Sequence, residues 1–236
     1  MAGDAEMRLP AKHAKHTKTK NKNFRVFSRD SRVNPIRIAG VVLAGGKSSR
    51  FGSDKSQLVI GGKPIVQLQL EKLAKTGCEP LFVCTQKSKL ITPPLHHSIT
   101  SIQDFHPNLG PIGGLHAALK KITVAQSSLP VDAIFLLACD MPLISANTIR
   151  RILRAFQRCD AVVPTHDGNL EPLCAVYSRK ILPAVESRIA ARKLAMHDLA
   201  KSLTTHFFDV STLANWEREF YNINTQKEYE QIRRKP

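Results

Sequence analysis

The chain has 236 residues, 42% of them hydrophobic, which is enough for the core of one sizeable α/β domain and too little for two. Its five cysteines are scattered and form no CxxC pair, so the sequence favours reduced thiols over a zinc ribbon or a disulfide framework. No apolar run approaches the roughly 20 residues of a membrane span and no secretory signal is visible, which predicts a cytoplasmic protein without membrane contact.

The net charge of +16 is not confined to one end of the chain. Residues 1–36 carry nine Lys/Arg and three Asp/Glu, and the remaining 200 residues have a net charge of +10. Because residues 37–236 are basic as well, the charge suits a polyanionic ligand such as a nucleotide. Residues 1–36 lack apolar periodicity, which predicts a basic, disordered leader before a single domain at residues 37–236. Nucleic-acid or membrane-surface contact is the alternative role for this leader, because lysine-rich runs bind phosphates without specificity.

From residue 36 onward, strand-like and helix-like segments alternate. Short apolar runs predict strands at residues 36–46, 80–85, 98–104, 132–140, 160–165 and 170–178. Apolar residues at helical spacing predict helices at residues 64–77, 110–122 and 145–156, with Gly77 as a stop and Ser145 as an N-cap. This alternation is typical of a Rossmann-like, three-layer αβα fold with a mostly parallel sheet.

Ligands of such sheets bind outside the carboxyl ends of the strands. Three candidate segments lie at the carboxyl ends of predicted strands: 45–55, 104–114 and 140–142. The sequence therefore predicts that these segments meet at one edge of the sheet and form the ligand site there.

The first of these segments belongs to the stretch GVVLAGGKSSRFGSDK, residues 40–55. It is not a P-loop, because five residues instead of four separate Gly40 from Gly46-Lys47-Ser48, and VVLA reads as strand. It is not a Rossmann fingerprint either, because its glycines are adjacent. Glycine backbone, two serines, Arg50 and Lys55 nevertheless predict a loop that holds phosphates.

This stretch resembles the LAGG-x3-R-(M/F)-G-x-DK signature of nucleotidyltransferases. Within that superfamily the chain is most similar to the molybdenum cofactor guanylyltransferases, the MobA-like family. Asp104 followed by GPIGGL, then ACDMP, and then YNINT near the C-terminus resemble three further segments of that family, in the same order. The resemblance covers about residues 38–229, which is the chain without its leader.

The resemblance implies transfer of GMP from GTP to molybdopterin with release of pyrophosphate, on a nucleotidyltransferase fold with Mg²⁺ as cofactor. It implies catalytic roles for Arg50, Lys55 and Asp140, with Asp140 as the metal ligand. It implies nucleotide contacts at Leu43, Ala44, Gly45, Gly46, Lys55, Cys84, Asp104, Gly110, Gly113 and Asp140. It implies contacts with the second substrate at Glu171, Asn222 and Asn224. Cys84 stands where the family often has Asn.

The residues themselves support part of this assignment. Asp140 ends a strongly apolar strand, where a carboxylate is costly unless it is paired, and Mg²⁺ accepts one or two carboxylates beside phosphate oxygens. Simpler roles remain open: Asp140 as a cap of the helix that begins at Ser145, Asp104 as a turn residue at a strand end, and Asn224 or Thr225 as a helix N-cap.

The implied nucleophile, a molybdopterin phosphate oxygen, is ionised at neutral pH. The reaction therefore needs positioning and charge neutralisation rather than a general base. The alternatives are a related nucleotidyltransferase that uses CTP or another nucleotide with a different phosphorylated acceptor, and a non-catalytic nucleic-acid-binding relative. We expect GTP and molybdopterin as partners, with transient contact to molybdenum cofactor biosynthesis or acceptor proteins, and no nucleic acid.

Overall fold

The structure is a computed structural model that describes residues 36–44, 55–85, 99–103, 108–124 and 130–233. The leader expected at residues 1–36 lies outside this part of the chain, apart from Ile36. Within the described residues, no helix is long and apolar enough to cross a membrane.

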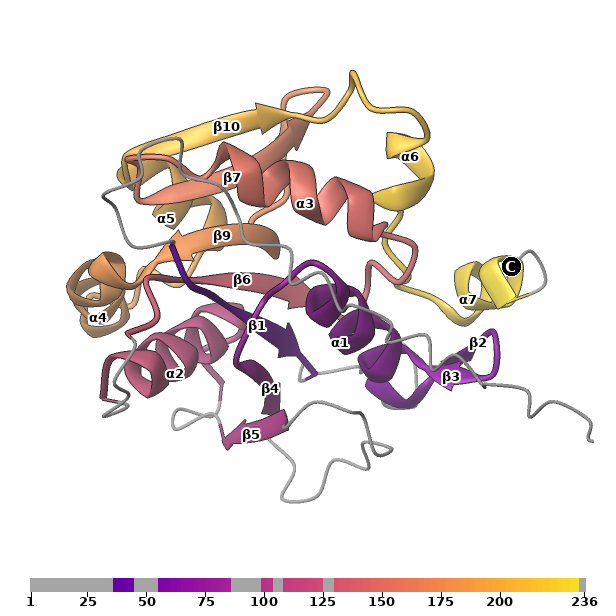
Figure 1. The fold of residues 1–236 in the computed structure, drawn as a ribbon, viewed down its shortest axis with the longest axis horizontal. Coiled ribbons are helices and arrows are strands. Elements are labelled where there is room, and N and C mark those ends of the chain that lie inside the picture. The colour runs from indigo at the N-terminus through magenta and orange to yellow at the C-terminus, as the bar shows by residue number, and fades with distance from the viewer. Residues whose placement is uncertain (1–35, 45–54, 86–98, 104–107, 125–129, 234–236) are drawn as a thin grey trace, which may run out of the picture.

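An eight-stranded sheet forms the centre of the domain (Figure 1). Its order is β10-β7-β9-β6-β1-β4-β5, and β8 pairs with β7. The strands are β1 Ile38–Leu43, β4 Leu81–Thr85, β5 Ile99–Gln103, β6 Ala133–Ala138, β7 Ala161–His166, β8 Asn169–Leu170, β9 Cys174–Ser178 and β10 Thr205–Asp209. β9 is antiparallel to β6 and β7, β8 is antiparallel to β7, and the other pairs are parallel. The prediction of a mostly parallel sheet is therefore confirmed.

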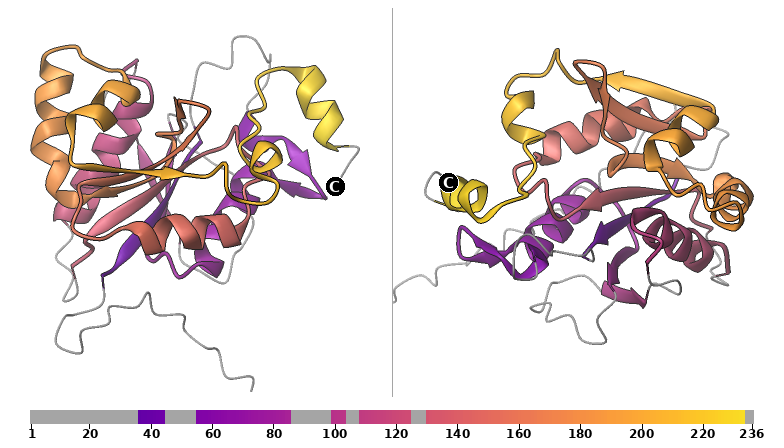
Figure 2. Two further views of the ribbon diagram at one scale, coloured as in Figure 1. Left: turned by 90° about the horizontal axis from the view of Figure 1, so that it is seen from above. Right: turned by 180° about the vertical axis from the view of Figure 1, so that it is seen from behind.

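Helices cover both faces of this sheet. They are α1 Ile65–Lys75, α2 Pro111–Val124, α3 Ala146–Ala155, α4 Leu182–Ala190, α5 Met196–Ser202, α6 Trp216–Glu219 and α7 Gln226–Arg233. α1 and α3 share one apolar cluster with the sheet, and α2, α4 and α5 share the cluster on the opposite face. Figure 2 shows these two helical layers with the sheet between them, so the expected three-layer architecture is confirmed.

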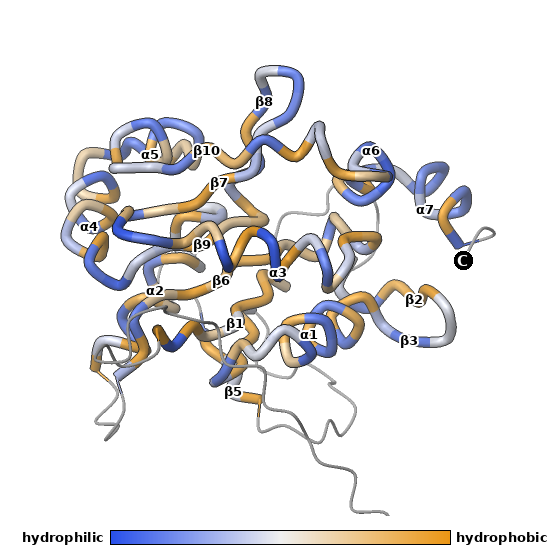
Figure 3. The backbone as a smooth tube through the Cα atoms, turned by 45° about the horizontal axis from the view of Figure 1, so that its top comes forward, coloured by the Kyte–Doolittle hydropathy of each residue, from blue (hydrophilic) through white to orange (hydrophobic). Residues whose placement is uncertain are grey.

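The central strands β1 and β6 are buried along their whole length. Continuous apolar runs, visible as orange tube in Figure 3, are typical of strands that helices cover on both faces. The helix ends agree with the sequence as well: Gly77 adopts a φ of +86° after α1, and the Ser145 side chain accepts a hydrogen bond from the Thr148 N–H at the start of α3. Local sequence signals therefore specify these elements.

A small antiparallel hairpin, β2 Val59–Ile60 and β3 Lys63–Pro64, and two short 3-10 helices, Lys55–Gln57 and Arg179–Ile181, complete the fold. The sequence did not predict this hairpin, nor α4, α5, α6 and β10. Each of these strands and helices is short, so its apolar pattern is too brief to read without tertiary contacts.

The chain reverses direction along the sheet at β1. The path from β1 through α1 adds β4 on one side, and the path from β5 through α2 adds β6 on the other. Such a switch point leaves a crevice at the carboxyl ends of the two central strands. Gly40 lies within β1, paired with Leu81 of β4 and Phe135 of β6, which confirms that it does not begin a P-loop.

Candidate active site

The carboxyl ends of β1 and β4 meet the beginning of α2. The Ala44 N–H donates to the Cys84 carbonyl at 2.9 Å, and the Cys84 thiol donates to the Gly114 carbonyl at 3.5 Å. A Cβ added at Gly114 would lie 2.6 Å from Leu43 Cδ2, so the glycine lets the Leu43 side chain pack directly against α2. Leu43, Ala44 and Cys84, three of the predicted nucleotide contacts, thus lie together at the predicted edge.

The glycines of the predicted middle segment fall into two environments. Gly110 has a φ of +69° and lies in the turn before α2. Gly113 and Gly114 are buried inside the first turns of α2 itself. The expected glycine-rich turn is therefore shorter than the sequence suggests, because the helix already starts at Pro111.

Beside this cluster the structure has a cavity of about 540 Å³. Three predicted site residues from distant parts of the sequence line it: Asp140, Glu171 and Asn222. The full lining is Pro111, Asp140, Met141, His166, Asn169, Leu170, Glu171, Pro172, Leu173, Leu194, Ala195, Met196, His197 and Asn222. Since Pro111 begins α2, the cavity adjoins the glycine segment, as the topology predicts.

Asp140 lies in the turn that follows β6. Its carbonyl accepts a hydrogen bond of 2.7 Å from the Ile223 N–H, which belongs to the segment between α6 and α7. This bond brings Asn222 next to Asp140 and explains why two residues 82 positions apart line one cavity.

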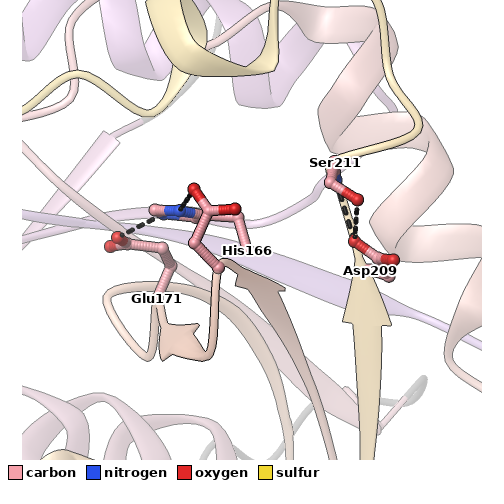
Figure 4. A network of polar contacts seen from close by, with 5 residues as sticks. His166, Glu171, Asp209 and Ser211 are labelled. Carbon is pink, nitrogen blue, oxygen red and sulfur yellow. Dashed lines mark hydrogen bonds and ion pairs between the residues drawn. The ribbon is translucent and has the colours of Figure 1, made fainter.

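His166 and Glu171 form the polar wall opposite this turn. The His166 Nε2 and a Glu171 carboxylate oxygen lie 3.1 Å apart, and Figure 4 shows this contact as a dashed line. The His166 ring lies against the indole of Trp216, with ring centroids 4.7 Å apart. Burial raises the pKa of Glu171, the His166 hydrogen bond and charge oppose that rise, and the Asp140 charge adds to it. The cavity therefore contains two carboxylates that influence one another.

Figure 4 also shows Asp209 at the end of β10, where its carboxylate accepts hydrogen bonds from the Ser211 N–H at 2.9 Å and the Ser211 hydroxyl at 2.7 Å. These bonds lower the pKa of Asp209. The pair closes a surface turn and does not belong to the cavity lining.

The histidines of the cavity were not predicted from the sequence. His166 precedes Asp167-Gly168, whose φ values of +48° and +76° make a two-residue hairpin turn between β7 and β8. An Asp-Gly pair between apolar runs is a strong hairpin signal, and it would have placed His166 at a strand end. No comparable signal precedes His197, which α5 brings to the rim.

Asn224 is not part of the cavity lining and is exposed. Its N–H and that of Thr225 donate to the Glu228 carboxylate at 2.6 and 2.7 Å, and the Glu228 N–H donates to the Thr225 hydroxyl at 3.3 Å. This reciprocal pattern is a capping box with Thr225 as the N-cap of α7. The simpler interpretation of this segment thus accounts for Thr225, and the second-substrate role of Asn224 stays a prediction.

Four predicted site residues, Gly45, Gly46, Arg50 and Asp104, lie outside the described residues. Lys55 begins the first 3-10 helix, and only its backbone is described. The predicted phosphate loop therefore stays a prediction.

The donor set of the cavity suits a hard cation that keeps phosphate and water ligands. In the described part of the chain, no group of three or more His, Cys, Asp or Glu side chains could hold a metal ion. Mg²⁺ needs no such protein cage, since one or two carboxylates and substrate phosphates suffice. Asp140 has the chemistry and the position for this role.

The family model described as "MobA-like NTP transferase domain" matches residues 40–206. The "Probable molybdenum cofactor guanylyltransferase" of Geobacillus sp. (strain WCH70) is 27% identical over 201 residues, which cover 83% of this chain and 98% of the relative. The protein of the same name from Carboxydothermus hydrogenoformans is 30% identical over 195 residues, which cover 81% and 92%.

Solved structures share the fold. Molybdopterin-guanine dinucleotide biosynthesis protein A from Archaeoglobus fulgidus has a TM-score of 0.65 at 23% identity, covering 84% of this chain and 97% of that one. A 4-diphosphocytidyl-2C-methyl-D-erythritol synthase from Anaerococcus prevotii has a TM-score of 0.62 at 12% identity, covering 84% and 95%. The family match covers well over half of the sequence and includes most of β1 and Asp140. The chain therefore belongs to the MobA-like NTP transferase domain family.

Proposed function

We propose that this protein transfers GMP from GTP to molybdopterin, forming molybdopterin guanine dinucleotide and releasing pyrophosphate. The observation that carries the proposal is the single cavity that unites Asp140, Glu171 and Asn222 beside the glycine segment of α2. It lies on a chain whose relatives, 27 to 30% identical over most of their length, are named molybdenum cofactor guanylyltransferases.

In this proposal the two substrates occupy opposite sides of Asp140. The guanine nucleotide lies at the ends of β1 and β4 and against the start of α2, where glycines allow a close approach to the backbone. The acceptor lies on the side of Glu171, His166 and Asn222. A phosphate oxygen of the acceptor attacks the α-phosphorus, a new P–O bond forms, and the bond to the pyrophosphate oxygen breaks.

In this reaction the residues of the chain hold the substrates in position and neutralise their charge. The attacking phosphate is already ionised, so no side chain has to remove a proton, and the cavity has to hold the acceptor in line with the leaving group. Arg50 and Lys55 are proposed as the cations that neutralise the phosphates of the nucleotide.

We propose Mg²⁺ as the cofactor and Asp140 as its protein ligand. When bound, the ion would neutralise charge on the phosphate oxygens. The carboxylate at the carboxyl end of β6 supports this role, because oxygen donors suit Mg²⁺.

The decisive experiment compares GTP, CTP, ATP and UTP with the full chain and Mg²⁺, by calorimetry and by pyrophosphate release with molybdopterin as acceptor. We expect preferential binding of GTP and a guanine dinucleotide product detected by mass spectrometry. Preference for CTP with no response to GTP would replace the guanylyl assignment with another nucleotidyl transfer. Absence of any nucleotide binding would reject the enzymatic proposal.

We further propose a cytoplasmic location, with transient contact to proteins that deliver molybdopterin or receive the product. Support for the location comes from the five cysteines, none of which forms a disulfide in the structure and four of which are buried. Cysteines without disulfides are typical of a reducing compartment.

A further inference from the structure

Three consecutive carbonyls in the turn after β6 accept hydrogen bonds from donors outside that turn. The carbonyl of Asp140 is held by the Ile223 N–H at 2.7 Å. The carbonyl of Met141 accepts from the Gln69 Nε2 at 2.7 Å, and that of Pro142 accepts from the Lys72 Nζ at 2.5 Å. Gln69 and Lys72 are three positions apart on α1, so both side chains leave the helix on the same face.

Gln69 is an unusual residue for its environment. It is fully buried in the layer between α1 and the sheet, and its Oε1 has no hydrogen-bond partner among the described residues. A buried acceptor without a partner costs about 1–3 kcal/mol, whereas an apolar side chain of similar volume would avoid this cost. The amide therefore gains only its donation to Met141, which points to a role for that bond beyond packing.

Lys72 is likewise a polar side chain that is costly to bury. Burial lowers its pKa to about 8, against the attraction of Glu219. Glu219, at the end of α6, itself accepts a hydrogen bond of 3.0 Å from the Ser145 N–H, just beyond the same turn. Hence α1 holds the turn with two polar side chains that are costly to bury, while Glu219 of α6 holds the start of α3 just beyond it.

We propose that Gln69 and Lys72 are positioning residues for Asp140. By fixing the next two carbonyls of the turn, they fix the direction in which the Asp140 carboxylate enters the cavity. Neither residue lines the cavity, and both act through the turn. This assignment rests on the proposed function, because the proposed function requires the Asp140 carboxylate to be held in one orientation. A displacement of about 1 Å at a reacting centre can lower a rate about 100-fold, so a firm turn matters for the transfer.

The test uses the full chain and a double-mutant cycle. The variants are Gln69→Leu and Lys72→Met, each alone and combined with Asp140→Asn, together with Lys72→Arg as a conservative replacement. Lys75→Met is the matched control, because Lys75 is an exposed lysine of the same helix that makes no bond to the turn. Binding of GTP is measured with and without Mg²⁺, kcat and KM by pyrophosphate release, and folding by thermal unfolding.

We expect Gln69→Leu and Lys72→Met to lower kcat about 10- to 100-fold and to weaken GTP binding only when Mg²⁺ is present. Neither should lower the unfolding temperature by more than a few degrees, since each removes a costly buried group. In the Asp140→Asn background both should have almost no further effect. Lys72→Arg should recover part of the activity, and Lys75→Met should behave as wild type.

Additive losses in the Asp140→Asn background, or equal losses of binding with and without Mg²⁺, would overturn this assignment and leave the guanylyltransferase proposal intact. Full activity of both single variants would overturn it in the same way. A wild-type chain that binds no nucleotide would instead reject the proposed function, and this assignment with it.

Discussion

The Tyr229 hydroxyl makes two hydrogen bonds to the backbone of Val59. It donates to the Val59 carbonyl at 2.8 Å and accepts from the Val59 N–H at 3.3 Å, across 170 positions of sequence. α7 thereby attaches to the β2–β3 hairpin (Figure 1). Since the segment before α7 contains Asn222 and Ile223, this contact helps to hold one wall of the cavity in place.

Replacing this hydroxyl should loosen the C-terminal segment. We expect Tyr229→Phe to lower the free energy of unfolding by about 1–2 kcal/mol, because the Val59 backbone loses its partner. Chemical denaturation measures the loss, and hydrogen exchange of the segment 221–229 should rise with it. Tyr221→Phe, at an exposed tyrosine, is the control and should change neither quantity. Equal effects of the two variants would show that the hydroxyl contact is unimportant.

Asp140→Asn should lower the rate of the reaction and leave the fold intact. We expect a 10²- to 10³-fold lower kcat, because the carboxylate charge at the transferred phosphate is lost while the shape is kept. The aspartate at the other end of β6, Asp132, accepts a hydrogen bond from the Arg37 N–H at 2.9 Å and supplies the control. Asp132→Asn should cost some stability and leave kcat unchanged. The metal assignment fails if both variants are equally active.

Glu171→Gln should increase stability and weaken acceptor binding. Burial raises the pKa of Glu171 in the folded state above its ordinary value of 4.5. At pH values between the ordinary pKa and the raised pKa, the folded state therefore binds more protons than the unfolded state. Stability is therefore lost as the pH rises through this window, and the ionised carboxylate remains unfavourable at neutral pH.

The glutamine variant removes this penalty. We expect a higher free energy of unfolding at pH 7, a gain that disappears below about pH 4, and a several-fold higher KM for molybdopterin. Thermal unfolding as a function of pH and steady-state kinetics measure the two effects. An unchanged KM would remove Glu171 from the acceptor side.

Gly40→Ala should destabilise the fold without changing the residues of the candidate site. The added Cβ would lie 2.8 Å from Leu81 Cδ2, 3.0 Å from Leu73 Cβ and 3.2 Å from Cys78 Cβ. Two of these neighbours are Cβ atoms that cannot rotate away, so we expect a loss of about 1–3 kcal/mol.

Gly62→Ala is the informative comparison, because it has no neighbour within 4 Å but a φ of +79°. Its expected cost is about 1 kcal/mol and comes from the backbone alone. Denaturant titration should rank Gly40→Ala as the more destabilising of the two. The reverse order would mean that α1 can move away from β1.

Because of Lys72, the free energy of unfolding should increase as the pH rises into the alkaline range. Its pKa of about 8 in the folded state lies below the ordinary 10.5, so the unfolded state binds more protons between these values and stability rises with pH. Burial is the main cause; Glu219 and Cys174 oppose it, and Lys75 adds to it.

We expect the free energy of unfolding of wild type, relative to Lys72→Met, to rise by about 2 kcal/mol from pH 7.5 to 9.5. Lys75→Met should retain most of this rise. Parallel curves for wild type and Lys72→Met would mean that Lys72 is not buried in solution.

Some elements could be predicted because their signals are local. The apolar run of β6, the Ser145 cap and the Gly77 stop each depend on a few neighbouring residues. The antiparallel direction of β9 was not predicted, although its cause is local too: the chain between β7 and β9 is too short for a crossover and forms the hairpin β7–β8 instead.

The sequence by itself determined the fold class, the family and the edge of the sheet where the candidate site lies. Alternating strands and helices force ligand-binding segments to the carboxyl ends, and the motif around residues 43–55 is contiguous. Only the tertiary structure decided which distant side chains meet there. His166 and Glu171 reach the cavity through a hairpin, Asn222 through the bond from Ile223 to Asp140, and the turn of Asp140 is held by Gln69 and Lys72. The bonds to the turn of Asp140 join residues 70 to 83 positions apart, and no periodicity or spacing in the sequence specifies which of them pair.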